Sequence, residues 1–200
     1  LVDPDAYFHI KFSYLMRRGH GLITSLPWLQ YTIHKDYFRD HHFLYHIIYI
    51  PFTFGNLIIG AKWGAVIFPS LAATAFFRLL TANQIKFAFV WSLLFLVSSR
   101  VFIYRMSMAR VQSISLLFMI LAVLFITEKR YIALSILAFL FVWLYDGFFM
   151  LAIIGVIFFF CKWGINKEKD LKLLIYLFSG ILMGMVINPY FPNNITSIIF

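Results

Sequence analysis

The chain has 200 residues, of which 62% are hydrophobic and 20% aromatic but only 12% charged. A soluble domain is about 45–50% apolar and about 25% charged, so this composition excludes an ordinary soluble domain and predicts a polytopic membrane protein. The net charge of +9 does not indicate nucleic-acid binding, because the basic residues punctuate apolar runs and do not gather on one polar face. We therefore expect an all-α integral membrane protein.

Residues 1–60 are predicted to form an external loop, and residues 61–200 a transmembrane helical bundle of the same domain. Helical spacing of apolar residues over 6–18 predicts an amphipathic helix that lies on the membrane surface. The apolar run 43–60 contains Pro51, which interrupts a helix, so we expect an interfacial or re-entrant segment there. Because no signal peptide precedes the loop and the chain ends in an apolar stretch, we expect a fragment of a longer protein.

Six further apolar runs are predicted to cross the membrane, and basic residues in three of their connections assign those connections to the cytoplasm. The predicted spans are 65–80, 87–99, 113–127, 131–145, 147–161 and 171–187. Residues 1–60, the loop 98–112, the turn at Asp146 and the segment 188–197 then lie on the non-cytoplasmic face. The predicted location is the plasma membrane, the bacterial inner membrane or an equivalent bilayer.

Ionisable side chains concentrate near the start of the chain. All six histidines and four of the eight acidic residues fall within the first 46 residues, and two carboxylates, Asp3 and Asp5, lie close to His9. Asp5 fits either a helix cap or a site carboxylate. The mixture of carboxylates and imidazoles at Asp36, Asp40 and His41 suits a divalent metal, although structural or interfacial roles are an open alternative.

The loop 98–112 carries three arginines, Arg100, Arg105 and Arg110, on the face where positive charge is disfavoured. Guanidinium groups match phosphate geometry, so this loop predicts recognition of a phosphate or pyrophosphate at the membrane surface. Contact with lipid headgroups is the alternative. Asp146 ends an apolar run, where an ionisable residue indicates either a functional site or a turn before a glycine.

The segment Asp5-Ala6-Tyr7-Phe8-His9-Ile10-Lys11, followed by an amphipathic helix, resembles the first external loop of the GT-C membrane glycosyltransferases. It is most similar to the catalytic subunits of oligosaccharyltransferases, and protein O-mannosyltransferases belong to the same superfamily. The segment Tyr104-Arg105-Met106-Ser107 resembles the start of their second external loop. That family continues with an acidic pair that helps to hold a metal, whereas this chain has Arg110-Val111-Gln112-Ser113.

The resemblance implies a GT-C-like helical bundle that moves a sugar from a polyprenyl-phosphate-linked donor to a protein, lipid or glycan acceptor outside the cytoplasm. Asp5 would be the catalytic residue, as general base or as ligand of a divalent cation (Mg²⁺ or Mn²⁺), with Asp3 as its substitute or partner. The three arginines of the loop 98–112 would bind the donor phosphate. The further candidates are Asp40 and His41 as metal ligands, and His9, Asp36 and Asp146. The competing interpretation is a non-catalytic polytopic protein that binds or transports a lipid-linked substrate.

Overall fold

The computed structural model describes residues 4–195, and every regular element in that range is helical. The longer helices are α1 (Pro4–Leu15), α2 (Phe43–Tyr49), α3 (Leu57–Ala82), α4 (Ala88–Leu96), α5 (Arg100–Met106), α6 (Val111–Thr127), α7 (Tyr131–Leu144), α8 (Phe149–Asn166) and α9 (Leu171–Val186). Four short turns accompany them: η1 (Met16–His20), η2 (Ile33–Lys35), η3 (Ile50–Thr53) and η4 (Asp146–Phe148). The all-α prediction is confirmed for the described residues.

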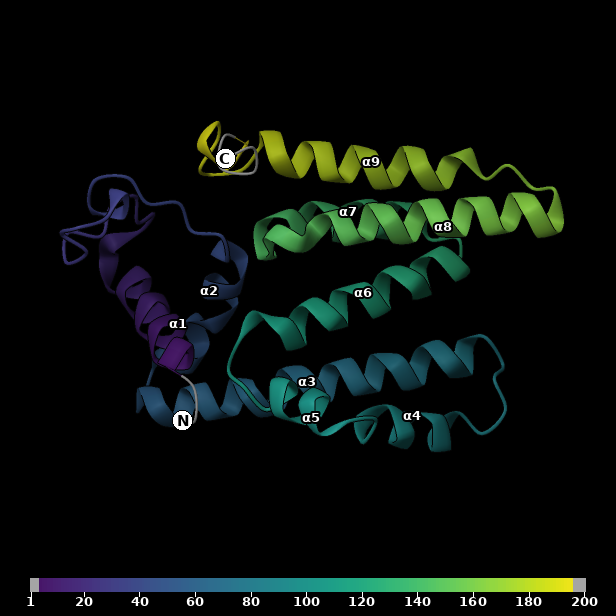
Figure 1. Cartoon of the computed structure of the whole chain (residues 1–200), viewed down its shortest axis with the longest axis horizontal. Helices are drawn as coiled ribbons and strands as arrows, with labels where there is room; N and C mark the ends of the chain where they lie inside the picture. The colour runs from purple at the N-terminus through teal and green to yellow at the C-terminus, as the bar shows by residue number, and fades with distance from the viewer. Residues whose placement is uncertain (1–3, 196–200) are drawn as a thin grey trace.

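The long helices run between two opposite ends of the molecule (Figure 1). At one end, which we call the α1–α2 end, α1 and α2 pack beside the first turns of α3 and α6, the turn η4 and the segment 188–195. The other end, the lysine-rich end, consists of the connections 83–87, 128–130 and 167–170. The α1–α2 end contains the described residues that the sequence assigned to the non-cytoplasmic face, except α5, which lines a cavity with residues 65–72 in the middle of α3.

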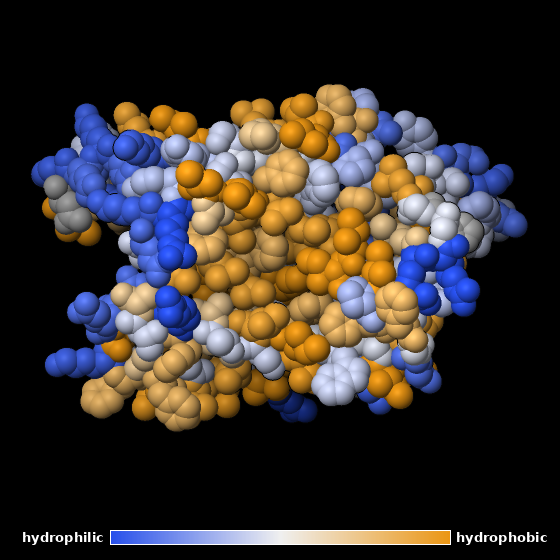
Figure 2. Space-filling view, turned by 180° about the vertical axis from the view of Figure 1, so that it is seen from behind, coloured by the Kyte–Doolittle hydropathy of each residue, from blue (hydrophilic) through white to orange (hydrophobic). Residues whose placement is uncertain are grey.

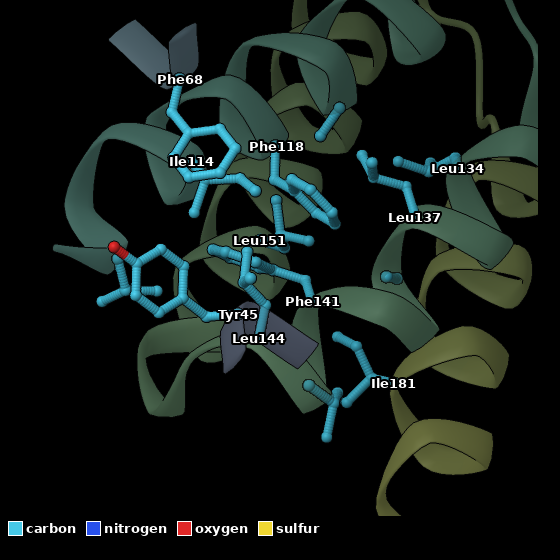
Figure 3. Close-up of a cluster of buried hydrophobic side chains, with 14 of the residues drawn as sticks. Tyr45, Phe68, Ile114, Phe118, Leu134, Leu137, Phe141, Leu144, Leu151 and Ile181 are labelled. Atoms are coloured by element: carbon cyan, nitrogen blue, oxygen red, sulfur yellow. The ribbon is translucent and has the colours of Figure 1, made fainter. Parts of the chain in front are cut away.

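One hydrophobic core joins α3 and α6 to α7, α8 and α9. Phe68 of α3, Phe118 of α6, Phe141 of α7 and Leu151 of α8 belong to this core, and the Phe118 and Phe141 rings stack (Figure 3). Tyr45 of α2 reaches the same cluster and is fully buried. The core therefore fixes α2, and with it the α1–α2 end, to the bundle.

Small residues allow helices to approach closely at two places. A Cβ atom on Gly180 of α9 would lie 2.2 Å from the main-chain oxygen of Ser135 in α7, and one on Gly184 would lie 2.8 Å from that of Phe139. Gly60 of α3 likewise faces the main chain of η3, at Phe52. Helices α3 and α9 each carry two glycines four residues apart, the spacing that lets helix backbones pack closely in membranes.

A continuous apolar band separates two hydrophilic ends on the face seen in Figure 2. Exposed large apolar side chains follow one stripe of α8, including Ile153, Ile157 and Phe160. Two described helices are long and apolar enough to cross a membrane, Leu57–Ala82 and Asp146–Ile165. The pair α4 and α5 makes a third if it counts as one broken span.

The predicted spans differ from the observed helices in three respects. The first begins at Leu57, well before the predicted 65–80, because Asn56 caps α3 by accepting the main-chain N–H groups of Ile58 and Ile59. The predicted span 87–99 is not continuous: α4 ends at Leu96, Ser99 caps α5, and the two helices meet at 84°. The runs near 113–127, 131–145 and 171–187 correspond to α6, α7 and α9, which are shorter apolar helices of 14 to 17 residues.

The expected break in the run 43–60 is present. Helix α2 passes into the tight turn η3 at Ile50, with Pro51 in its first turn, and α3 begins only at Leu57. The helix predicted over 6–18 is α1, which is followed by η1, where Gly19 takes a positive φ of 101°. Its buried face is formed by Ala6, His9, Ile10, Phe12 and Ser13, which places His9 inside the fold.

Candidate functional site

The first polar contact of the α1–α2 end joins α1 to α6. Asp5 lies in the first turn of α1, and its carboxylate oxygen Oδ2 is 2.9 Å from the guanidinium Nη2 of Arg110, the residue that precedes α6. The Asp5 side chain is 56% exposed and that of Arg110 27%. This ion pair brings together residues from the two segments that the sequence separately indicated as candidate site regions. Both charged groups remain accessible at the surface of the molecule.

The second contact is a buried chain of hydrogen bonds. The Asp40 carboxylate accepts a bond of 2.6 Å from Nδ1 of His46, and Nε2 of His46 lies 2.8 Å from Nδ1 of His9. The Asp40 and His46 side chains are 2% and 1% exposed. The other Asp40 oxygen accepts the main-chain N–H of His42 at 2.9 Å. The carboxylate is therefore held by two donors, and the chain runs from the loop before α2 into α1.

Aromatic rings enclose this chain. Phe12 of α1 lies against the His46 ring, with 4.6 Å between centroids, and Tyr45 meets the His9 ring edge-on. The neighbouring His42 ring stacks on Tyr145. Burial is the main cause that lowers the pKa of His42, and the nearby His46 adds to it, whereas Asp40 opposes the shift. His42 is therefore disposed to stay neutral beside the chain.

The third contact joins the loop before α2 to the start of α8. Arg39 donates from Nη2 to both carboxylate oxygens of Asp146, at 3.1 and 3.0 Å, and His41 lies 2.8 Å from the same carboxylate. Arg39 also donates to the main-chain oxygen of Asn194, at 2.6 Å. Asp146 thus links the loop before α2 to the turn η4 between α7 and α8. The small cavity beside it has a volume of about 10 Å³, the space of one water molecule.

A large apolar groove runs along the outer side of α1. Its volume is about 760 Å³, within the range of small-molecule sites. Its lining includes Tyr7, Phe8 and Lys11 of α1, Trp28 and the first residues of α3. Tyr7 and Phe8 follow Asp5 within one helical turn, but Asp5 and Arg110 are not part of the groove's lining. An acyl or isoprenoid chain would suit its walls, and the Lys11 ammonium would suit an anionic group.

The other predicted site residues lie elsewhere. Arg100 and Arg105 are exposed on α5 and have no ion-pair partner among residues 4–195. Asp36 is exposed at the end of η2 and takes no part in the three contacts. Asp3 lies outside the described residues. Of the three arginines proposed for the donor phosphate, the structure brings only Arg110 to Asp5.

The predicted metal ligands do not converge in the described part of the chain. Asp5 pairs with Arg110, Asp40 with His46, and His41 with Asp146. No group of three or more His, Cys, Asp and Glu side chains among these residues is arranged to hold a metal ion. The divalent cation stays a prediction, and no chemical step below passes through it.

Two residues of this site were not selected from the sequence. His46 stands inside an apolar run, and Arg39 precedes the acidic cluster, so neither matches a recognised motif. The available signal was weak: a histidine within an apolar helix, six residues after an acid. Its partner His9 lies 37 residues away, and such a pairing is visible only after folding.

Comparison with known proteins identifies no relative: no family of known proteins, no curated protein sequence and no solved structure matches this chain.

Proposed function

We propose that this chain is part of a membrane glycosyltransferase, which moves a sugar from a polyprenyl-phosphate-linked donor to an acceptor at the non-cytoplasmic face. The observation that carries the proposal is the contact of 2.9 Å between Asp5 and Arg110. Glycosyl transfer from a phosphate donor needs a cation where the leaving phosphate gains charge, and a carboxylate or another base near the attacking group. Arg110 and Asp5 supply this combination at an accessible position.

The apolar groove beside α1 supports a lipid-carried donor. Its aromatic and aliphatic walls suit the polyprenyl chain, while Lys11 in its lining and Arg110, which pairs with Asp5 at the start of the same helix, suit the phosphate that joins this chain to the sugar. A soluble nucleotide-sugar donor would have no use for an apolar groove of about 760 Å³ that opens on a membrane protein's surface. The donor lipid would thus lie along α1 with its headgroup toward Asp5.

The membrane arrangement is part of the same proposal. We place α3, α6, α7, α8 and α9 across the bilayer, together with the bent pair α4 and α5. The shorter helices would span about 21–26 Å, so the bilayer must be locally thin or their ends must lie in the interface. The basic residues of the lysine-rich end support a cytoplasmic position for that end. The α1–α2 end then faces the non-cytoplasmic side.

The test is sugar transfer by the full-length protein in proteoliposomes. The donors are undecaprenyl-phosphate-linked mannose, glucose and N-acetylglucosamine, and the acceptors are octyl glycosides and Ser/Thr-containing and Asn-containing peptides. We expect Asp5→Asn and Arg110→Gln each to lower kcat/KM by about 10²–10³-fold, because each removes a group that acts on the reacting atoms.

The matched controls come from the exposed ion pairs at the lysine-rich end, Lys129 with Glu168 and Arg130 with Glu128. Glu168→Gln and Arg130→Gln remove the same charges far from α1, from side chains that are 48% and 63% exposed, and should leave transfer unchanged. Wild-type activity in both Asp5→Asn and Arg110→Gln would refute the proposed centre. Binding of the donors without release of polyprenyl phosphate would instead favour the non-catalytic binder or transporter.

A further inference from the structure

We propose that the cavity beside α5 binds one anionic phospholipid, with an acyl chain inside the cavity and the headgroup phosphate against Arg100 and Arg105. We call this space the α5 cavity. The inference rests on the membrane arrangement proposed above, but it requires no sugar transfer. It gives a role to the two arginines of the loop 98–112 that lie apart from the pair of Asp5 and Arg110.

The α5 cavity is an apolar space between α3, α5 and α6. Its volume is about 280 Å³, and Leu116 of α6 is part of its lining. Its two serines, Ser70 and Ser107, already donate to main-chain oxygens within one helical turn. The lining therefore suits a hydrocarbon chain better than a polar ligand. Its main walls are formed by Ala65, Pro69 and Ala72 of α3 and by Phe102, Ile103 and Met106 of α5.

The bend between α4 and α5 places this cavity within the layer of long helices. Helix α4 returns along α3 from the lysine-rich end, and its nine residues rise about 14 Å (Figure 1). Helix α5 then turns by 84° and packs beside the middle of α3. Two lining residues, Val66 and Ile103, are 58% and 48% exposed. The cavity is thus open on the side of the bundle, where a membrane lipid can enter it.

The arginines of α5 supply the charge that selects the lipid. Arg100 and Arg105 are exposed, and among residues 4–195 neither has an ion-pair partner. Helical spacing places both outside the face that lines the cavity, where their long side chains can follow the lipid toward its headgroup. A guanidinium group at membrane depth is costly unless an anion accompanies it, and phosphate matches its geometry. A lipid phosphate is the anion that the bilayer itself offers.

The size of the cavity separates this lipid from the proposed donor. The groove along α1 has a volume of about 760 Å³ and the α5 cavity about 280 Å³. We therefore assign the long polyprenyl chain to the groove and the shorter acyl chain to the α5 cavity. Two arginines should favour an anionic headgroup over a zwitterionic one by about 10–30-fold, because the zwitterion carries its own cation beside the phosphate.

The test is photo-crosslinking of lipids to the full-length protein in phosphatidylcholine nanodiscs. Phosphatidylglycerol and phosphatidylcholine probes carry the same diazirine in one acyl chain and are added at equal mole fractions. Mass spectrometry of the labelled peptides locates the crosslinks. We expect phosphatidylglycerol to label residues 65–72 and α5 about 10–30-fold more strongly than phosphatidylcholine does.

The charge is tested by substitution on α5. Arg100→Gln combined with Arg105→Gln should bring labelling by phosphatidylglycerol down to the level of phosphatidylcholine. Arg78→Gln is the matched control, because Arg78 is an exposed arginine near the other end of α3. It should leave the preference for phosphatidylglycerol at the α5 cavity unchanged.

The cavity itself is tested by added bulk. Val66→Phe enlarges a side chain of the lining and should lower labelling by phosphatidylglycerol several-fold. Val90→Phe in α4 makes the same change at a residue that is 49% exposed and outside the lining, so it should label as the wild type does. Because all the substituted residues are exposed, the variants should melt at the wild-type temperature in phosphatidylcholine nanodiscs, which separates loss of the site from misfolding.

The possible outcomes distinguish this inference from the proposed sugar transfer. Equal labelling of the α5 cavity by the two lipids, or a preference that survives the double arginine substitution, would refute it. If undecaprenyl phosphate displaced the phosphatidylglycerol probe more strongly than unlabelled phosphatidylglycerol did, the cavity would belong to the donor lipid and the inference would fail. The assay contains no sugar donor, so a protein that transfers no sugar can still confirm the lipid site, and a failed lipid site leaves sugar transfer standing.

Discussion

The ionisable residues of the α1–α2 end divide by burial into two kinds. Asp5 and Arg110 are accessible and form a pair that water screens, which contributes little to stability but leaves both groups available to a substrate. Asp40 and His46 are buried, so their bond must be satisfied for the fold to form. A single loop residue, Asp40, thus holds the start of α2 in place.

Replacement of Asp40 by alanine should destabilise the protein strongly. It leaves two buried donors, the main-chain N–H of His42 and Nδ1–H of His46, without their acceptor, at about 1–3 kcal/mol each. Thermal unfolding in lipid nanodiscs checks this, with Asp36→Ala on the exposed η2 loop as control. Equal melting temperatures for the two variants would contradict the buried chain.

Asp170, at the lysine-rich end, gives stability a defined pH dependence. Burial alone would raise its pKa, but hydrogen bonds from Tyr131 and Lys162 outweigh burial and hold the pKa of Asp170 below the ordinary carboxyl value. The contribution of Asp170 to the free energy of unfolding is therefore complete above the carboxyl pKa of the unfolded chain, roughly pH 4. It is lost as the pH falls through the lower pKa of the folded protein. The melting temperatures of wild type and Asp170→Asn should differ at pH 6 and converge in acid; a constant difference would disprove this.

At the scale of helices, close packing of α9 on α7 organises one half of the bundle. Gly180 and Gly184 face the α7 main chain, and Trp143 donates from its indole nitrogen to the Gly184 oxygen at 3.0 Å. The two glycines and their spacing stand in the sequence, but their partner helix does not follow from it. The contact becomes apparent only when α7 and α9 are placed side by side (Figure 1).

Gly180→Ala should therefore weaken the α7–α9 contact, because its Cβ would meet the Ser135 oxygen at 2.2 Å. Overpacking of this kind costs about 1–3 kcal/mol. Gly164→Ala in α8 is the matched control, since a Cβ there meets nothing within 4 Å and alanine favours the helix. A melting temperature for Gly180→Ala as high as that of Gly164→Ala would show that the helices are not so close.

The sequence predicts the helices and several of their ends from local features. Apolar composition and the positions of proline and glycine determine the backbone conformation within one or two helical turns. Pro51 broke the run 43–60 as expected, and the glycines after α1 end that segment. The bend at Ser99 was missed because a continuous apolar run carries no mark of an 84° turn. Asp5 and Arg110 were each selected, but 105 positions separate them, and His46 carries only a weak local signal.

At the scale of the whole molecule, two polar ends and an apolar band predict a fixed orientation in the membrane (Figure 2). Cysteines at Ser107 and Lys167, both exposed, report on the two ends once the native Cys161 is replaced by serine. A membrane-impermeant maleimide should label Ser107→Cys from the non-cytoplasmic side and Lys167→Cys from the cytoplasmic side. Labelling of both from one side would overturn the arrangement of spans.

The central claim is sugar transfer from a lipid-linked donor at the α1–α2 end. The most direct measurement places the undecaprenyl-phosphate-linked sugars in the exposed leaflet of sealed vesicles, in either orientation, and follows the release of undecaprenyl phosphate with the glycosylated acceptor. We expect stoichiometric release of both products in vesicles that expose the α1–α2 end, strongly reduced release with Asp5→Asn, and none in inverted vesicles. Absence of release in both orientations, or equal release by Asp5→Asn, would contradict the claim.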